Sequence, residues 1–245
     1  MLSTTTVKQN GYLTLEHRSN IELYYTQIEL ITEDHLILTG DEFHHSVNVM
    51  RNSIGDTIFV TDGKGSIITS KIVSINEKQL SASIIDKRIF ENTAGNIWFC
   101  IPMLKNSDRL KFALEKCVEL GITNFILFSS RYTLSKKVKP EKFHKTVLAA
   151  MKQSLRAFLP QITYASFNDI IKLEGLKILF DQNEKLEFEG KAELNKVTYF
   201  LFGPEGGFDK NEIELVEQQN RFSLSTNRLR SETAIIKCAS LIKLS

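Results

Sequence analysis

The feature that most restricts the fold of this chain is a change in the spacing of its apolar residues at about residues 90–96. Before this polar stretch, the sequence has the short period of strands, and residues 57–61 and 66–75 flank the turn Asp62-Gly-Lys-Gly65, which predicts a hairpin. After it, apolar strands alternate with segments of helical period, as in an α/β sheet. The chain is therefore predicted to contain two domains of different architecture.

The first domain is expected over residues 21–90, as a small antiparallel barrel or sandwich. Two further alternating runs, at 34–39 and 80–86, supply strands beside the hairpin. Asp41 is expected to cap a short helix that ends near Met50, with Met50 turned inward.

The second domain is expected over residues 96–245, as a parallel sheet flanked by helices. Its predicted strands lie at 97–101, 122–128, 176–180, 197–202 and 222–224. Its first two predicted helices lie at 108–120, before Gly121, and at 141–158, before Pro160.

A glycine-rich turn, Gly203-Pro-Glu-Gly-Gly207, follows the buried strand at 197–202. Glycine has no Cβ, so backbone here is free to approach a ligand closely. Asp209 and Glu212 then form a capping-box pattern for a helix. Taken alone, the glycines are equally compatible with a simple turn.

A second loop, Leu224-Ser-Thr-Asn-Arg-Leu-Arg-Ser-Glu-Thr-Ala234, follows the next short strand. Ser231 or Thr233 is expected to begin the last helix. If both strands are parallel neighbours, the two loops face each other across a crevice, which is where open α/β sheets bind ligands.

Charge gives only a weak indication of function. The 245 residues carry 31 Lys+Arg and 29 Asp+Glu, so the net charge of +2 does not itself indicate nucleic-acid binding. Basic residues gather at 131–145 and between 51 and 88. On the residues alone, ordinary solvated surfaces are the favoured interpretation of both groups.

Cys100, Cys117 and Cys238 are widely spaced among apolar neighbours, which predicts buried thiols in a reducing compartment. No cysteine or histidine spacing suggests a metal site. The polar residues 1–20 lack a hydrophobic signal core and are expected to form a flexible extension. We find no stretch of membrane-spanning length, and we expect a cytoplasmic protein.

The two loops together resemble the cofactor-binding half of the SPOUT methyltransferases, in particular the RsmE family, which methylates N3 of a uridine in 16S ribosomal RNA. Upstream segments are similar to further signatures of that family: Arg109-Leu-Lys-Phe-Ala-Leu-Glu-Lys-Cys-Val-Glu-Leu-Gly121, Ser130-Arg-Tyr-Thr-Leu-Ser135, Met151-Lys-Gln-Ser-Leu-Arg156 and His45-Ser-Val-Asn-Val-Met-Arg51. The resemblance covers about residue 21 to the C-terminus.

The resemblance implies a SPOUT-type parallel sheet with a C-terminal trefoil knot, preceded by a PUA-like β-barrel domain. It also implies S-adenosylmethionine as cofactor, bound within the knot, a homodimer, and the small ribosomal subunit as substrate. Periodicity supports the sheet but gives no information on a knot.

We expect the cofactor at the two loops, where an apolar slot and closely approaching backbone would hold it. The expected binding residues are Phe202, Gly203, Glu205, Gly206, Leu224, Leu229 and Thr233. Glu205 is expected near a ribose hydroxyl or the sulfonium, with solvent exposure on the turn as the alternative. Ser225 stands where the family usually has glycine, and it would be strained if that position requires a positive φ.

Methylation at N3 of uridine requires loss of a proton, which spreads negative charge onto O2 and O4. Arg230 is the candidate for stabilising that charge, and Glu232 for orienting it or accepting the proton. A structural salt bridge between Arg230 and Glu232 is the alternative. Phosphate contacts are expected from Arg51, Arg88, Arg131, Arg156 and Arg228.

Two other functions remain open. The first is a non-catalytic RNA-binding or ribosome-assembly protein that retains the fold, which Ser225 makes reasonable. The second is a nucleotide-binding enzyme of Rossmann type. Residues 101–105, Ile-Pro-Met-Leu-Lys, disfavour it because no GxGxxG follows the first strand of the second domain.

Overall fold

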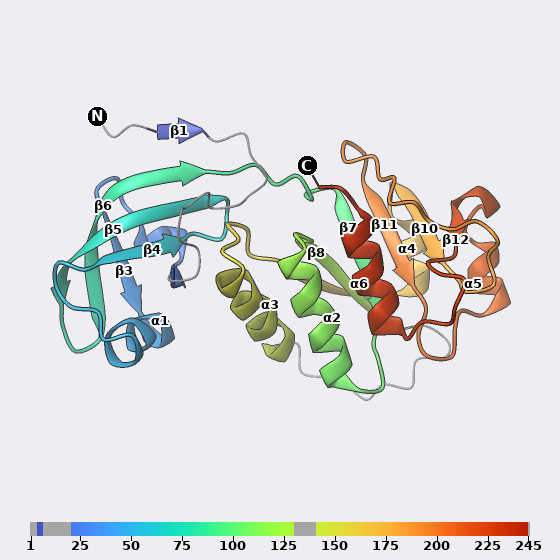
Figure 1. Cartoon of the computed structure of the whole chain (residues 1–245), viewed down its shortest axis with the longest axis horizontal. Helices are drawn as coiled ribbons and strands as arrows, with labels where there is room; N and C mark the ends of the chain where they lie inside the picture. Colours follow the sequence, from blue (N-terminus) through green and yellow to red (C-terminus); the bar gives the residue numbers. More distant parts are fainter. Residues whose placement is uncertain (1–3, 7–20, 130–140, 245) are drawn as a thin grey trace. The chain divides into compact units, whose positions relative to one another are not determined.

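The computed structural model describes the backbone of residues 4–6 and all of residues 21–129 and 141–244. The chain divides into two compact units (Figure 1). Unit 1 comprises Met1–Asn92 together with Met151–Leu159, and unit 2 comprises Thr93–Ala150 and Pro160–Ser245.

Unit 1 contains a curled six-stranded sheet in the order β1-β6-β5-β4-β2, with β3 also paired to β6. The strands are β1 Thr4–Thr6, β2 Leu23–Tyr25, β3 His35–Thr39, β4 Thr57–Thr61, β5 Ser66–Ile75 and β6 Gln79–Ile89. The predicted hairpin is confirmed, since β4 and β5 pair antiparallel. The sheet is not wholly antiparallel, however, because β1 pairs parallel with β6 and β2 with β4. Three residues of the expected extension therefore belong to the sheet.

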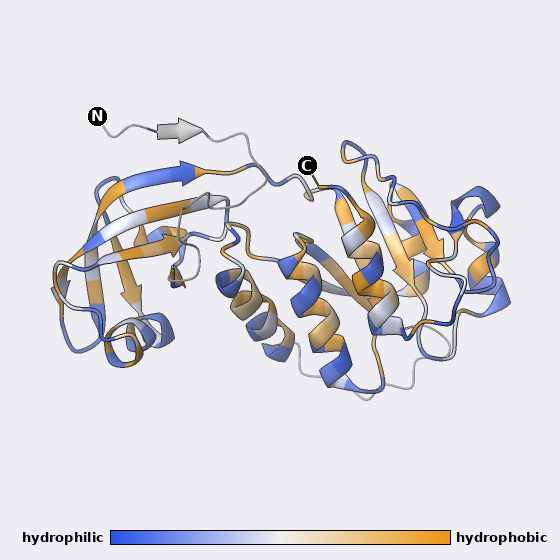
Figure 2. Cartoon of the chain, viewed as in Figure 1, coloured by the Kyte–Doolittle hydropathy of each residue, from blue (hydrophilic) through white to orange (hydrophobic). Residues whose placement is uncertain are grey.

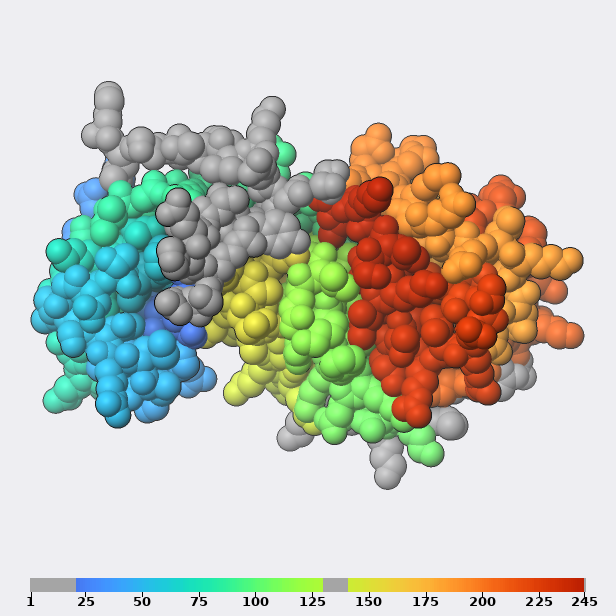
Figure 3. Space-filling model, in the orientation of Figure 1, coloured from blue at the N-terminus to red at the C-terminus, as the bar shows by residue number. Residues whose placement is uncertain are grey.

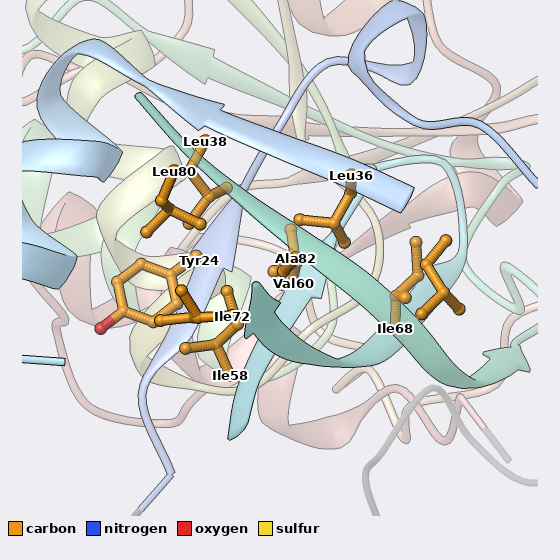
Figure 4. Close-up of a cluster of buried hydrophobic side chains, with 10 residues drawn as sticks. Tyr24, Leu36, Leu38, Ile58, Val60, Ile68, Ile72, Leu80 and Ala82 are labelled. Atoms are coloured by element: carbon orange, nitrogen blue, oxygen red, sulfur yellow. The ribbon is translucent and has the colours of Figure 1, made fainter. Parts of the chain in front are cut away.

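The core of unit 1 lies inside the curl of this sheet, where apolar side chains from five strands point toward one another (Figure 4). Its buried members are Tyr24, Leu36, Leu38, Ile58, Val60, Ile68, Ile72, Leu80, Ala82 and Ile84. Along β5, burial of Ile68, Ser70 and Ile72 follows the two-residue period by which one face of a strand is covered.

The segment between β3 and β4 differs from the sequence prediction. A short 3-10 turn, η2 Ile28–Leu30, precedes β3, and helix α1, Gly40–His44, follows it and continues as the π-helical turn η3, His45–Val49. The N-cap is Thr39 rather than Asp41, and Met50 is 46% exposed rather than turned inward. The wide turn buries Ser46, and Asn52 Nδ2 donates to Ser46 Oγ at 3.0 Å.

Unit 1 is completed by residues 151–159, which come from far along the chain. Helix α3 spans Glu141–Gln153, so the predicted helix at 141–158 ends early. The reason is that Leu155 takes φ 56° and the following backbone pairs with the hairpin turn. Gly65 N donates to Ala157 O at 3.0 Å, and Leu159 N donates to Gly63 O at 2.8 Å.

Burial explains why this segment joins unit 1. Leu155 and Ala157 lie in a second cluster with Leu23, Ile67 and Phe90. Pro160 therefore follows an extended segment rather than stopping a helix.

Unit 2 contains a six-stranded, wholly parallel sheet in the order β12-β10-β11-β7-β8-β9. The strands are β7 Ile97–Pro102, β8 Asn124–Ser129, β9 Gln161–Ser166, β10 Leu176–Phe180, β11 Thr198–Phe202 and β12 Arg221–Phe222. The helical elements are α2 Ser107–Glu119, the part of α3 up to Ala150, α4 Phe167–Lys172, α5 Lys210–Glu214, η4 Gln218–Asn220 and α6 Ser231–Leu241. Strand β9 and helix α4 were not predicted. Exposed residues at 161, 163 and 164 give this edge strand a weak apolar signal.

Helices cover both faces of this sheet, whose strands are strongly hydrophobic (Figure 2). Helices α2 and α6 pack side by side, as the space-filling view also shows (Figure 3). On the opposite face, α4 and the loop around α5 bury Phe167, Ile170 and Phe208 against Cys100 and Leu201 of the strands. The layers are those of the predicted α/β domain.

The predicted burial of the three cysteines, Cys100, Cys117 and Cys238, is confirmed, and all three are free thiols. Their burial raises the pKa of each thiol well above its usual range. Within the described ranges, no helix combines the length and apolar character needed to cross a membrane.

Candidate cofactor and substrate site

Four loops meet at the carboxyl-terminal edge of the sheet in unit 2. They follow β7, β10, β11 and β12, which are neighbours or next neighbours in the sheet. Parallel strands end at the same edge, so the sheet itself gathers these loops. The predicted cofactor and catalytic residues belong to two of them, after β11 and after β12.

The loop after β11 carries the predicted glycine turn. Gly207 has φ +77°, and a Cβ built there would meet nothing within 4 Å, so open space lies beside its backbone. Gly203 has no positive φ, and a Cβ there would touch the Phe208 ring at 3.4 Å, an ordinary contact. Conformation thus requires glycine at Gly207, whereas at Gly203 and the exposed Gly206 the local backbone imposes no such requirement.

The predicted capping box at the end of this loop is confirmed. Asp209 is the N-cap of α5; its Oδ1 accepts from Asn211 N at 2.9 Å, and its own backbone N donates to Glu212 Oε2 at 2.9 Å. Such a cap is worth about 1 kcal/mol. It fixes the point where the chain leaves the glycine turn.

Glu205 connects the glycine turn to the loop after β7. Its Oε1 accepts a hydrogen bond from Lys105 N at 3.1 Å, although the Glu205 residue as a whole is exposed. The carboxylate predicted to contact the cofactor thus also orders a neighbouring loop.

The loop after β12 is tied directly to the glycine turn. Ser231 Oγ donates to Gly203 O at 3.1 Å. Arg230, with extended φ −72° and ψ 153°, is the N-cap of α6 and makes no side-chain capping bond. The last helix begins at Ser231, one of the two expected starts, and the Ser231 hydroxyl is directed to the other loop rather than to a cap.

Ser225 is not strained. The non-glycine residues with positive φ among those described are Arg51 and Leu155, so the substitution of the family's usual glycine imposes no left-handed backbone here. Ser225 Oγ instead accepts from Asn227 N at 3.2 Å and orders the loop. Backbone strain at Ser225 is therefore no reason to expect weakened cofactor binding.

A third loop, after β10, was missed by the sequence analysis. Phe188 N donates to Ser223 O at 2.9 Å, and Ser223 N donates to Leu186 O at 2.7 Å. Asp181 N also donates to Phe222 O at 3.0 Å. Residues 181–188 therefore lie beside the end of β12 and the start of the loop that follows it. The polar run Asp181-Gln-Asn-Glu184 directly after a strand was the available signal.

The predicted apolar slot residues lie at different depths. Phe202 is 1% exposed, and its ring packs on those of Phe99 and Phe180, with centroids 5.1 and 5.2 Å away. Its side chain is core, so any contact with a cofactor falls to its backbone. Leu224 is buried and Leu229 partly buried.

The candidate catalytic residues Arg230 and Glu232 do not pair with each other. Glu232 faces Arg109 of α2, with Glu232 Oε1 3.6 Å from Arg109 Nε, rather than Arg230. Arg230, Arg228 and Thr233 are exposed. The alternative of a salt bridge between Arg230 and Glu232 is therefore wrong, because residues two apart do not face each other at a helix start.

The predicted phosphate-binding arginines are distributed over both units. In unit 1, Arg51 is exposed, and its backbone has a positive φ of 60°. Arg88 Nε lies 3.3 Å from Asp86 Oδ2. Arg156 also belongs to unit 1, within 151–159, and not to the catalytic domain as expected. Arg131 lies outside the described residues.

A pocket of about 290 Å³ opens beside the capping box of α5. It is lined by Ser129, Ser166, Phe167, Asn168, Asp209, Asn211, Glu212 and Leu215. None of the predicted cofactor or catalytic residues is in its lining. In residues 21–129 and 141–244, no group of three His, Cys, Asp or Glu side chains is placed to hold a metal ion.

Comparison with known proteins is consistent across the chain. A model of the RNA methyltransferase domain matches residues 91–243, and a model of the RNA methyltransferase PUA domain matches residues 38–85. The ribosomal RNA small subunit methyltransferase E 1 of Borreliella burgdorferi is 30% identical over 240 residues, which cover 93% of each chain. The methyltransferase E of Bacillus subtilis is 27% identical over 245 residues, covering 91% of this chain and 94% of its own.

Solved structures confirm the fold. A probable rRNA-methyltransferase from Porphyromonas gingivalis superposes with a TM-score of 0.77 at 26% identity, covering 89% of this chain and 95% of its own. The small subunit methyltransferase E of Neisseria gonorrhoeae, solved bound to S-adenosyl methionine, gives 0.79 at 23% identity, covering 90% and 96%. The predicted PUA-like domain followed by a SPOUT-type sheet is confirmed, while the knot stays a prediction.

Proposed function

This chain belongs to the RsmE family of RNA methyltransferases, and on that premise we propose that it transfers a methyl group from S-adenosylmethionine to N3 of a uridine in 16S ribosomal RNA. The observation that carries this proposal to specific residues is the hydrogen bond from Ser231 Oγ to Gly203 O, 3.1 Å long. It joins the two family loops into one site at the sheet edge, where α/β folds bind ligands.

The residues at these loops fit the cofactor. Open space beside Gly207 gives a ligand access to backbone, and Leu224 and Leu229 supply apolar surface beside it. Glu205, Gly203 and Gly206 complete the proposed binding set, with the backbone of Phe202 and the exposed Thr233. When bound, S-adenosylmethionine supplies an electrophilic methyl group.

The side chains at the start of α6 serve the nucleophile. Arg230 is exposed, so its guanidinium is available to donate to O2 or O4 of the uracil as N3 loses its proton. Glu232 orients the uracil or accepts that proton. Arg228, exposed in the same loop, contacts phosphate.

We further propose that unit 1 docks on the RNA. Arg51, Arg88 and Arg156 would make phosphate contacts that do not depend on sequence, joined by Arg131 from unit 2. Structured RNA in the assembled subunit is the expected substrate, and the cytoplasm is the expected location.

A homodimer is proposed as the working form. Phe112 on α2 is 49% exposed, a large aromatic surface on a helix that also packs against α6. A single exposed aromatic side chain is common on protein surfaces, so the dimer is proposed from the family, and Phe112 is the residue chosen to test it. Light scattering at micromolar concentration should show a dimer, and Phe112→Ser should weaken it; a monomeric wild-type protein would contradict this part of the proposal.

The test of the reaction is mass spectrometry of nucleosides from unmodified small subunits incubated with protein and cofactor. We expect N3-methyluridine with the native chain and none with Gly206→Val, whose side chain would occupy the cofactor's approach. Calorimetry should show loss of S-adenosylmethionine binding in that variant without loss of folding. Methyl on a ribose oxygen or a guanine would refute the assigned chemistry.

The non-catalytic alternative keeps no specific support. Its motive was strain at Ser225, and the backbone there is not left-handed. Absence of any methyl transfer by a protein that binds subunits would nonetheless establish it.

A further inference from the structure

We propose that Arg109 is a positioning residue of the methyl-transfer site: it holds the carboxylate of Glu232 and thereby leaves Arg230 available to the uracil. The inference rests on the proposed function, because it concerns how Glu232 and Arg230 are presented to the substrate. Nothing in the loop sequences indicates it, since Arg109 lies on a different helix, more than a hundred residues earlier.

The first observation is the environment of Glu232. Its side chain is 12% exposed, against 38% for Arg109, and Oε1 lies 3.6 Å from Arg109 Nε. A charged side chain this covered needs a partner of opposite charge or a hydrogen bond. Within the described residues, Arg109 is the cation paired with it.

The second observation is the position of the two residues in their helices. Glu232 is the second residue of α6, where the helix dipole favours an anion. Arg109 is the third residue of α2, where the same effect disfavours a cation. Local helix stability therefore explains Glu232 but not Arg109, whose contact across to α6 offsets an unfavourable position in α2.

Other cations of α2 behave differently. Lys111 Nζ pairs with Asp108 at 3.1 Å, and Lys116 Nζ pairs with Glu119 at 2.8 Å, all within the same helix. Arg109 instead links two helices that both begin at the carboxyl edge of the sheet. The link fixes the first turn of α6 relative to α2.

Because Glu232 pairs with Arg109, it does not pair with Arg230. Arg230 is the N-cap of α6 and exposed, so its guanidinium projects from the start of the helix while Glu232 is held against α2. If Glu232 paired with Arg230 instead, the proposed donor to uracil would be occupied. Arg109 thus separates the two charges that the reaction uses.

The first test measures steady-state methylation of small subunits. Arg109→Ala should lower kcat by about 10- to 100-fold, the usual range for a misplaced catalytic group, with KM for subunits and the S-adenosylmethionine affinity within about twofold. Arg109→Lys, which keeps a cation, should recover part of the loss. Lys111→Ala is the matched control that removes a cation from the same helix, and it should leave all constants unchanged.

The second test asks whether an ion pair between α2 and α6 is sufficient for activity when the Glu232 carboxylate itself is absent. The double variant Arg109→Glu with Glu232→Arg restores an ion pair with its charges exchanged, so the melting temperature should return toward wild type while kcat stays low. Recovery of kcat in the exchanged pair would overturn the proposal, because the link alone would then suffice. Normal kcat in a folded Arg109→Ala protein would overturn it too.

Failure of this inference differs from failure of the proposed function. If the wild-type protein methylates subunits and the Arg109 variants do so equally well, only the role of Arg109 is lost. If the wild-type protein transfers no methyl group, the reaction itself is wrong.

Discussion

The two units of this protein are assembled from the chain in different ways. In unit 2, the loops of the proposed site all follow strands of one parallel sheet, so the proposed functional residues lie at one edge of that sheet. Unit 1 is completed by Met151–Leu159, which come after the chain has already formed β7, α2 and β8 of unit 2. Residues 1–90 are therefore not a separable module. Deleting them would remove the residues against which Leu155 and Ala157 are buried.

The largest expected effect lies in unit 2. Arg230→Ala should lower turnover by ~10²–10³-fold, the usual loss when one donor to a developing negative charge is removed. Because Arg230 is exposed and only its backbone caps α6, the melting temperature should hardly change. Single-turnover methylation with calorimetry of the cofactor checks both statements. Equal loss of cofactor affinity would place Arg230 in the cofactor site instead.

The next effect tests the closure of unit 1. Gly65 has φ +109°, and a Cβ there would lie 2.8 Å from Phe158 Cζ and 3.0 Å from Phe90 O. Gly65→Ala should therefore displace residues 151–159 and lower the free energy of unfolding by about 2–4 kcal/mol, from backbone strain and overpacking together.

Gly55→Ala is the matched control for that prediction. Its φ of +98° is similar, but a Cβ there meets nothing within 4 Å, so only the backbone strain of about 1–2 kcal/mol remains. Denaturant melts of both variants give the difference. Equal destabilisation would mean that the segment at 151–159 adapts to the added methyl group and does not depend on close contact with Gly65.

The same contrast explains what the sequence could predict. Five of the six strands of unit 2, the hairpin of unit 1 and the capping box at Asp209 follow from local patterns, and the structure confirms them. The early end of α3 does not, because apolar residues at 155 and 158 keep a helical spacing that tertiary pairing overrides. At the site, the glycine and hydroxyl loops were predictable, but the ion pair from Arg109 to Glu232 requires knowing which helices are neighbours.

A smaller effect concerns the proposed RNA contacts of unit 1. Arg51→Ala should reduce the slope of log K against log salt by about one, as expected for one lost phosphate contact. Arg88→Ala should reduce it less, because Arg88 Nε already lies 3.3 Å from Asp86 Oδ2. Filter binding of small subunits from 50 to 200 mM salt would measure both. An unchanged slope for Arg51→Ala would remove that residue from the RNA surface.

The smallest effect is expected at Ser225, where the family usually has glycine. Its φ is not positive, so Ser225→Gly relieves no strain; the variant loses the Oγ acceptor for Asn227 N and gains flexibility. Each of these changes costs about 0.5–1 kcal/mol at most. We therefore expect cofactor affinity to fall by no more than a few fold in Ser225→Gly, and Ser225→Ala, which keeps the Cβ, to show only the hydroxyl's share. Calorimetry that found cofactor binding tightened tenfold by glycine would mean that the loop after β12 must change conformation to bind its ligand. The glycine turn after β11, already open beside Gly207, would then be the only preformed half of the site among the described residues.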